Sequence, residues 1–93
     1  MLKVYTKNNC GYCEMAKAML KNNDIPFETV NVEDDADAMK FILEQGLRSM
    51  PQIFKGDQLF VQGGYQGMQQ MGVENIKNKL NEESIDTSTL GSI

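Results

Sequence analysis

The spacing of hydrophobic and polar residues along this chain predicts both strands and helices. Alternation with a two-residue period is typical of a strand with one buried face. This pattern, with Val, Tyr and Phe at several positions, predicts strands at residues 2–6, 27–32, 51–54 and 58–61. The last two are separated by a segment containing Lys-Gly-Asp, which predicts a hairpin.

Apolar residues recur at helical spacing in three further segments, which begin at Tyr12, at Asp34 or Asp35, and at Met68. Pro26 stops the first helix, Gly46 caps the second, and a break is expected in the third near Gly72. The acidic run at 33–37 is interpreted as the start of the second helix rather than as a metal site. The residues predicted to face inward are Tyr12, Met15, Ala16, Met19, Leu20, Met39, Ile42, Leu43, Met68, Met71, Ile76 and Leu80.

The order of elements, β-α-β-α-β-β-α, predicts an α/β fold with a mixed sheet. A β-α-β start implies two parallel strands joined by a crossover helix, and the later hairpin adds antiparallel strands to the same sheet. Helices are expected on both faces. The chain is interpreted as one domain over residues 1–83, followed by a flexible Ser/Thr-rich tail over 84–93.

Composition narrows the range of functions. The chain has 93 residues, 41% of them hydrophobic, and a net charge of −4. The hydrophobic content is sufficient for a packed core, and the negative charge argues against binding to nucleic acid or to an anionic membrane surface. The N-terminus has no apolar leader and the chain has no long apolar run, so a soluble, cytoplasmic protein is expected.

The two cysteines of the chain, Cys10 and Cys13, are the candidate chemical groups. A disulfide between them closes too short a loop to stabilise the fold much. A structural zinc site requires four ligands, and the chain has neither histidine nor a third cysteine. Two inert buried cysteines or a redox-active pair remain, and the position after a strand and at a helix start favours the redox pair.

A cysteine at the start of a helix is expected to be reactive. The unpaired N–H groups and the helix dipole stabilise its thiolate, and thiol pKa values of about 3.5–7.5 are found for Cys-X-X-Cys motifs, against about 8.5 for free cysteine. Lys7 adds a positive charge three residues before Cys10. We therefore expect Cys10 to attack a disulfide and Cys13, shielded one turn later, to resolve the mixed disulfide.

These residues resemble a known family. KNNCGYC after the first strand, RSMPQIF at the third and GGY after the fourth are similar to the motifs of glutaredoxins, from about Leu2 to Leu80. The resemblance implies a thioredoxin-like fold with a four-stranded mixed sheet flanked by about three helices. It also implies that Cys10 is the nucleophile and Cys13 the resolving thiol.

The resemblance further implies a binding site for glutathione as a cosubstrate, with a cis-proline at Pro51. Two cations are expected to meet glutathione carboxylates, and backbone groups beside the proline and in the glycine loop are expected to contact the peptide. The residues so implied are Lys7, Tyr12, Arg48, Met50, Pro51, Gly63, Gly64, Tyr65 and Gln66.

Two positions depart from the family pattern. Gly11 stands between the cysteines where proline is commonest, and family members with a small residue there include some that share a [2Fe–2S] cluster between two subunits. Gln66 and Gly67 stand where acidic residues usually meet the glutathione amine. Because of this second departure, the chain could instead resemble a related group of redoxins that draw electrons from thioredoxin reductase.

The main interpretation is a glutathione-dependent thiol–disulfide oxidoreductase that reduces protein disulfides or glutathione mixed disulfides through Cys10 and Cys13. It is expected to be a monomer, to need no prosthetic group or metal, and to include ribonucleotide reductase among its partners, as the resemblance implies. The alternatives are a redoxin reduced by thioredoxin reductase and a dimeric [2Fe–2S] protein.

Overall fold

The structure, a computed structural model, describes residues 1–81. Its elements are β1 (Leu2–Thr6), α1 (Gly11–Asn22), β2 (Phe27–Asn31), α2 (Ala36–Glu44), β3 (Gln52–Lys55), β4 (Gln58–Val61) and α3 (Gly64–Met71), followed by a further helix over 73–81. The predicted end of the domain at residue 83 and the predicted flexible tail at 84–93 lie outside the described residues.

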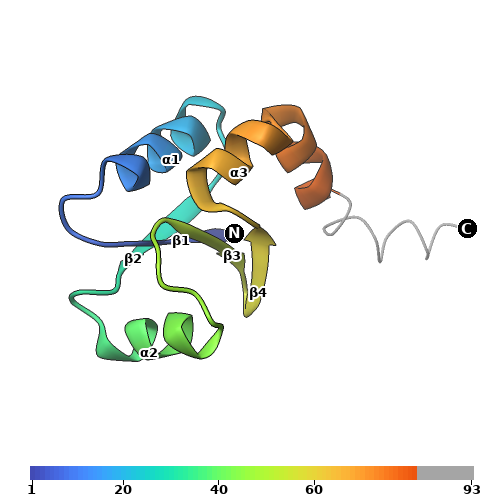
Figure 1. The fold of residues 1–93 in the computed structure, drawn as a ribbon. Helices are drawn as coiled ribbons and strands as arrows, with labels where there is room; N and C mark the ends of the chain where they lie inside the picture. The colour runs from blue at the N-terminus through green and yellow to red at the C-terminus, as the bar shows by residue number, and fades with distance from the viewer. Residues whose placement is uncertain (82–93) are drawn as a thin grey trace, which may run out of the picture.

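The four strands form one mixed sheet in the order β2-β1-β3-β4. Strand β1 pairs in parallel with β2 and antiparallel with β3, and β3 pairs antiparallel with β4. Helices α1 and α3 lie over one face of the sheet and α2 lies over the other (Figure 1). The predicted α/β class, the mixed sheet and the coverage of both faces are confirmed.

The ends of the helices follow from local residues. Asp35, rather than Asp34, caps α2 by accepting a hydrogen bond from the Ala38 N–H at 3.0 Å. Gly72 adopts a positive φ of 82°, which ends α3 and makes the helix at 73–81 a fourth, separate helix. The predicted break near Gly72 is therefore confirmed. Within residues 1–81 no helix is both long enough and apolar enough to cross a bilayer.

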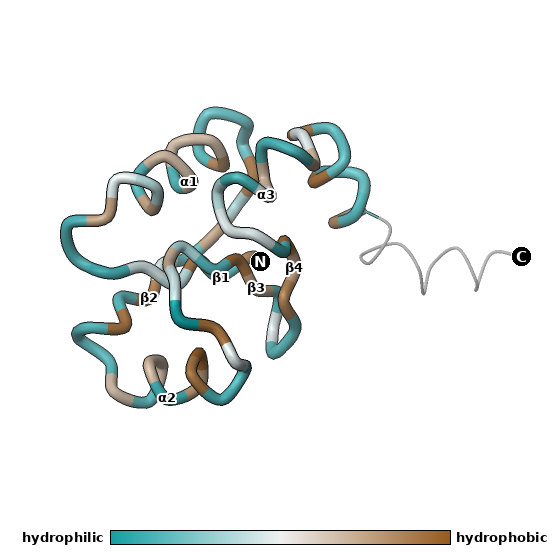
Figure 2. Tube along the Cα trace, in the orientation of Figure 1, coloured by the Kyte–Doolittle hydropathy of each residue, from teal (hydrophilic) through white to brown (hydrophobic). Residues whose placement is uncertain are grey.

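The hydrophobic core has two parts, one on each side of the sheet. In Figure 2 hydrophobic residues concentrate along β3 and β4, and the turns at the outside are hydrophilic. One cluster of buried residues contains Leu2, Val4, Ala16, Leu20, Ile25, Ile53, Phe60, Val61, Met68 and Ile76. The other contains Tyr5, Cys13, Val32, Ala38, Ile42, Met50 and Phe54. Full burial of each large apolar side chain contributes about 1.5–3 kcal/mol to stability.

Some of the predicted inward faces are wrong. Tyr12 and Met15 are 54% and 47% exposed, because α1 buries the narrower stripe that holds Cys13, Ala16 and Leu20. Met39 and Leu43 are also exposed, because α2 buries Ala38 and Ile42 instead. In a helix of 9 residues several stripes contain enough apolar residues to be the buried one, and only packing against the sheet selects among them.

Replacement of Gly67 by alanine is expected to destabilise the fold. A Cβ at this position of α3 would overlap the carbonyl oxygen of Gln62 and lie 3.2 Å from Val61 Cγ1. Backbone atoms yield less readily than side chains, so we expect Gly67→Ala to lower the free energy of unfolding by about 1–3 kcal/mol. Gly11→Ala is the matched control, because a Cβ at Gly11 has nothing within 4 Å. Urea unfolding measures both, and equal stability of the two variants would contradict the close approach.

Candidate functional site

The two cysteines form a disulfide at the start of α1, with their Cα atoms 5.2 Å apart. Cys10 is the N-cap residue of this helix, and its Sγ accepts a hydrogen bond from the Cys13 N–H at 3.1 Å. The carbonyl oxygen of Cys10 accepts a hydrogen bond from the Glu14 N–H at 3.2 Å and so completes the first turn. The sulfur of Cys10 thus lies where a helix presents unpaired N–H groups and the positive end of its dipole.

The two sulfurs differ in accessibility. Cys13 is fully buried, in the core cluster that also contains Tyr5, Met50 and Phe54. Cys10 is half-buried at the edge of the same cluster. Tyr5 lies in this cluster too, and its burial there raises the pKa of its hydroxyl above the ordinary value. An incoming disulfide or thiolate can therefore reach Cys10, whereas Cys13 reacts only with a partner already attached to Cys10.

The segment before β3 meets the disulfide from the other side. The Met50–Pro51 peptide bond is cis, in agreement with the expectation for Pro51. The Met50 carbonyl oxygen lies 3.8 Å from Cys10 Sγ. Met50 is buried in the same core cluster as Cys13, and its carbonyl oxygen is the group that faces Cys10 Sγ.

The glycine loop before α3 packs closely against the same segment. Gly63 and Gly64 adopt positive φ values of 95° and 61°, which side chains rarely allow. A Cβ on Gly64 would come within 2.9 Å of the Pro51 carbonyl oxygen. Glycine is thus required both by the backbone conformation and by the close approach of the two loops.

These segments enclose a pocket of about 180 Å³ beside the disulfide. The rings of Tyr12 and Tyr65 border it, with centroids 6.2 Å apart and planes inclined by 31°. Among residues 1–81, no charged side chain lines it. Its lining residues are Tyr12, Ser49, Met50, Pro51, Gly63, Gly64, Tyr65 and Gln66.

Most of the residues predicted from the sequence therefore come together, and two do not. Lys7 and Arg48 are exposed, lie on the segments that lead to Cys10 and Met50, and do not line this pocket. Ser49 is a lining residue that sequence reasoning missed. Ser49 lies between Arg48 and Met50, next to the predicted proline segment, and this position alone could have indicated that it lines the pocket.

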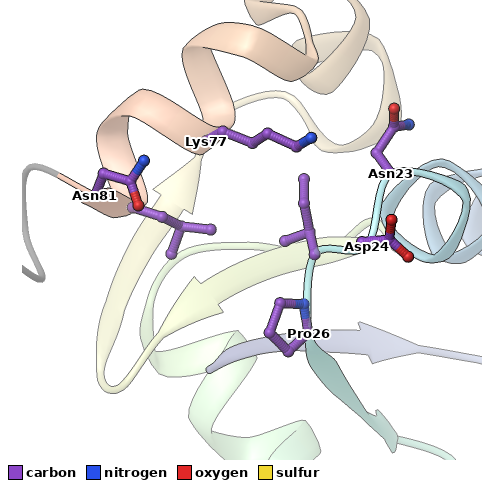
Figure 3. A pocket seen from close by; sticks show the side chains of 7 residues that line it. Asn23, Asp24, Pro26, Lys77 and Asn81 are labelled. Atoms are coloured by element: carbon purple, nitrogen blue, oxygen red, sulfur yellow. The ribbon is translucent and has the colours of Figure 1, made fainter.

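A second pocket, of about 250 Å³, lies between the end of α1 and the helix at 73–81 (Figure 3). It contains none of the residues predicted for the site, and both cysteines lie elsewhere. Its lining residues are Asn23, Asp24, Ile25, Pro26, Lys77, Leu80 and Asn81. In the part of the chain that the structure describes, no group of three or more Cys, Asp or Glu side chains is placed to hold a metal ion.

Comparison with known proteins places this geometry in a family. The family model for glutaredoxin matches residues 2–60. The glutaredoxin-like protein NrdH of Lactococcus lactis subsp. lactis (strain IL1403) is 37% identical over 60 residues, which cover 64% of this chain and 83% of that protein.

Solved structures agree with the fold. A buckwheat glutaredoxin–glutathione complex matches with a TM-score of 0.70 at 22% identity, covering 87% of this chain and 76% of that one. The NrdH-redoxin of Escherichia coli, a glutaredoxin-like protein described as having a thioredoxin-like activity profile, matches with a TM-score of 0.57 at 32% identity, covering 60% of this chain and 74% of that one. With the matched family model and the Cys10–Cys13 pair at the head of α1, the chain belongs to the glutaredoxin family of thiol–disulfide oxidoreductases.

Proposed function

We propose that this protein reduces disulfides of other proteins through Cys10 and Cys13, and that thioredoxin reductase rather than glutathione returns it to the dithiol form. The uncharged pocket beside the disulfide is the observation that carries the choice of electron donor. We propose ribonucleotide reductase as the protein that accepts the electrons. The proposed location of this reaction is the cytoplasm.

The proposed reaction uses the difference in exposure between the two sulfurs. In the reduced protein the Cys10 thiolate attacks one sulfur of the substrate disulfide, so that a mixed disulfide forms and the other substrate sulfur leaves as a thiolate, which takes up a proton. Cys13 then loses its proton and attacks Cys10 Sγ, which forms the Cys10–Cys13 disulfide seen here and releases the second substrate thiol. Two electrons pass to the substrate, and a reductase must supply two electrons and two protons to reset the pair.

The pocket offers little for the charged amine of glutathione. In the part of the chain that the structure describes, Gln66 is the one side-chain amide that lines the pocket, and no lining residue carries a negative charge. The next position, Gly67, has no room for a carboxylate, because even a Cβ there would overlap the Gln62 carbonyl oxygen. A buried ammonium without a counter-charge loses the stronger class of hydrogen bond. The similarity to the NrdH-redoxin of Escherichia coli, described as having a thioredoxin-like activity profile, supports the same choice.

Dependence on glutathione is the second candidate function. The cis-proline segment and the glycine loop line the pocket with backbone groups that suit an extended peptide, and this pocket is the observation that favours glutathione. Lys7 and Arg48, both exposed, are available to carboxylates of a bound tripeptide.

The proposed roles of the cysteines predict different losses for the two serine variants. Cys10→Ser removes the attacking sulfur, so reduction of insulin disulfides should fall to the rate without protein. Cys13→Ser should stop turnover after the first step and leave a covalent complex between Cys10 and the substrate, which intact-protein mass spectrometry detects. Retained turnover in Cys10→Ser, or a trapped complex through Cys13 instead, would contradict this assignment.

The choice of donor predicts a difference between two coupled assays. With NADPH and thioredoxin reductase, reduction of an insulin disulfide should be faster than with NADPH, glutathione and glutathione reductase, because bound glutathione lacks a charge-assisted hydrogen bond to its amine. Gln66→Glu is a matched variant that adds only a negative charge, and it should raise the glutathione-driven rate without changing the thioredoxin reductase rate. A faster wild-type rate with glutathione would establish the second candidate instead.

A further inference from the structure

The loop that leads from β1 to Cys10 is held in a conformation that needs support. Asn9, directly before Cys10, has a φ of +55°, in the left-handed region that residues other than glycine adopt infrequently. Asparagine tolerates this region better than most side chains, but the conformation persists only where its surroundings maintain it. The loop must therefore be fixed by contacts outside itself.

Three polar residues supply these contacts in a closed ring of hydrogen bonds. The Glu33 carboxylate accepts from the Asn8 N–H at 3.1 Å and from Asn8 Nδ2 at 2.9 Å. Asn8 Oδ1 accepts from Asn31 Nδ2 at 2.8 Å, and Asn31 Oδ1 accepts from the Glu33 N–H at 2.9 Å. Asn8, Asn31 and Glu33 are thus each hydrogen-bonded to the other two.

The ring joins two segments that are far apart in the sequence. Asn8 belongs to the loop before Cys10, whereas Asn31 ends β2 and Glu33 follows it. A backbone hydrogen bond of 2.9 Å from the Val32 N–H to the Thr6 carbonyl oxygen continues the pairing of β1 and β2 up to this point. Glu33 begins the acidic run at 33–37. Asp35 in this run caps α2, whereas Glu33 accepts hydrogen bonds from Asn8 in the loop before Cys10.

We propose that Glu33, Asn8 and Asn31 are positioning residues for Cys10: they hold the loop so that Cys10 Sγ accepts the Cys13 N–H at the start of α1. The inference rests on the proposed redox role of Cys10 and names residues that set its reactivity. A sulfur so placed is stabilised as thiolate by the N–H group and the helix dipole. Release of the loop weakens both effects and makes Cys10 a slower nucleophile.

The direct test is the rate at which iodoacetamide alkylates Cys10, measured about one pH unit below the midpoint of the parent's own rate–pH profile, where the rate follows the thiolate fraction, and in a Cys13→Ser background so that one thiol reacts. Asn31→Ala and Asn8→Ala change no charge, and the charged residues on the segments adjoining Cys10, namely Lys7, Glu14 and Arg48, stay in place. Each variant should react about threefold more slowly, which corresponds to about half a pKa unit. The double variant should be no slower than the slower single one, because either change opens the same ring.

Two further variants separate positioning from other effects. Asn78→Ala is the matched control, an exposed asparagine on the helix at 73–81, and should leave the rate unchanged. Glu33→Gln keeps the shape of the side chain but removes a charge and an acceptor. Loss of a negative charge by itself would favour the thiolate, so a slower reaction of Glu33→Gln indicates lost positioning.

The outcomes are distinct from those that test the proposed function, because alkylation needs neither an electron donor nor a protein substrate. Slower alkylation in both asparagine variants with the thermal unfolding midpoint within a few degrees of the parent supports the ring. Unchanged or faster alkylation in folded variants, or a lower unfolding midpoint with no change in rate, overturns it. If Asn31→Ala fails to fold, Asn8→Ala decides, since it retains the backbone hydrogen bond from Asn8 to Glu33.

Discussion

The unpaired N–H groups at the start of α1 are the constraint on which the site depends. A helix leaves its first N–H groups without partners, and here the sulfur of Cys10 accepts one of them from Cys13. Cys10 Sγ therefore both caps the helix and is the reactive atom of the site. A conventional cap such as serine would satisfy the same N–H but could not exchange disulfides.

Burial then gives the two sulfurs different roles. Cys13 occupies the core beside Tyr5 and Phe54, where no external partner reaches it, while Cys10 stays accessible at the edge. The order of attack in the proposed reaction follows from this difference alone. It does not depend on any group outside the chain.

Close approach of backbones forms the rest of the site. The Met50–Pro51 segment borders Cys10, and Gly64 packs against the Pro51 carbonyl oxygen so tightly that a side chain would not fit. The resulting pocket is walled by backbone and by two tyrosine rings, and its polarity comes from neutral groups. Such a pocket offers main-chain groups rather than charges to a ligand, which is consistent with the proposal that extended segments of other proteins bind there.

Much of the site could be predicted from the sequence because its chemistry is local. Cys10 and Cys13 are one helical turn apart, and the strand before them and the helical period after them place the pair at a helix start. The cis-proline and glycine-loop residues were recognised by motifs, and seven of the predicted residues line one pocket: Tyr12, Met50, Pro51, Gly63, Gly64, Tyr65 and Gln66.

The sequence alone determined the order of elements and the identity of the reactive pair, because each depends on residues close together in the chain. The mixed sheet followed from that order, since a β-α-β unit makes a parallel pair and a hairpin an antiparallel one. The tertiary structure decided which stripes of α1 and α2 are buried, where Lys7 and Arg48 stand relative to the pocket, and that Glu33 reaches Asn8. These contacts join segments up to tens of residues apart, and hydrophobic or charge patterns within one segment do not specify its distant partner. Packing of the helices on the sheet selected one arrangement among several that the pattern of residues allowed.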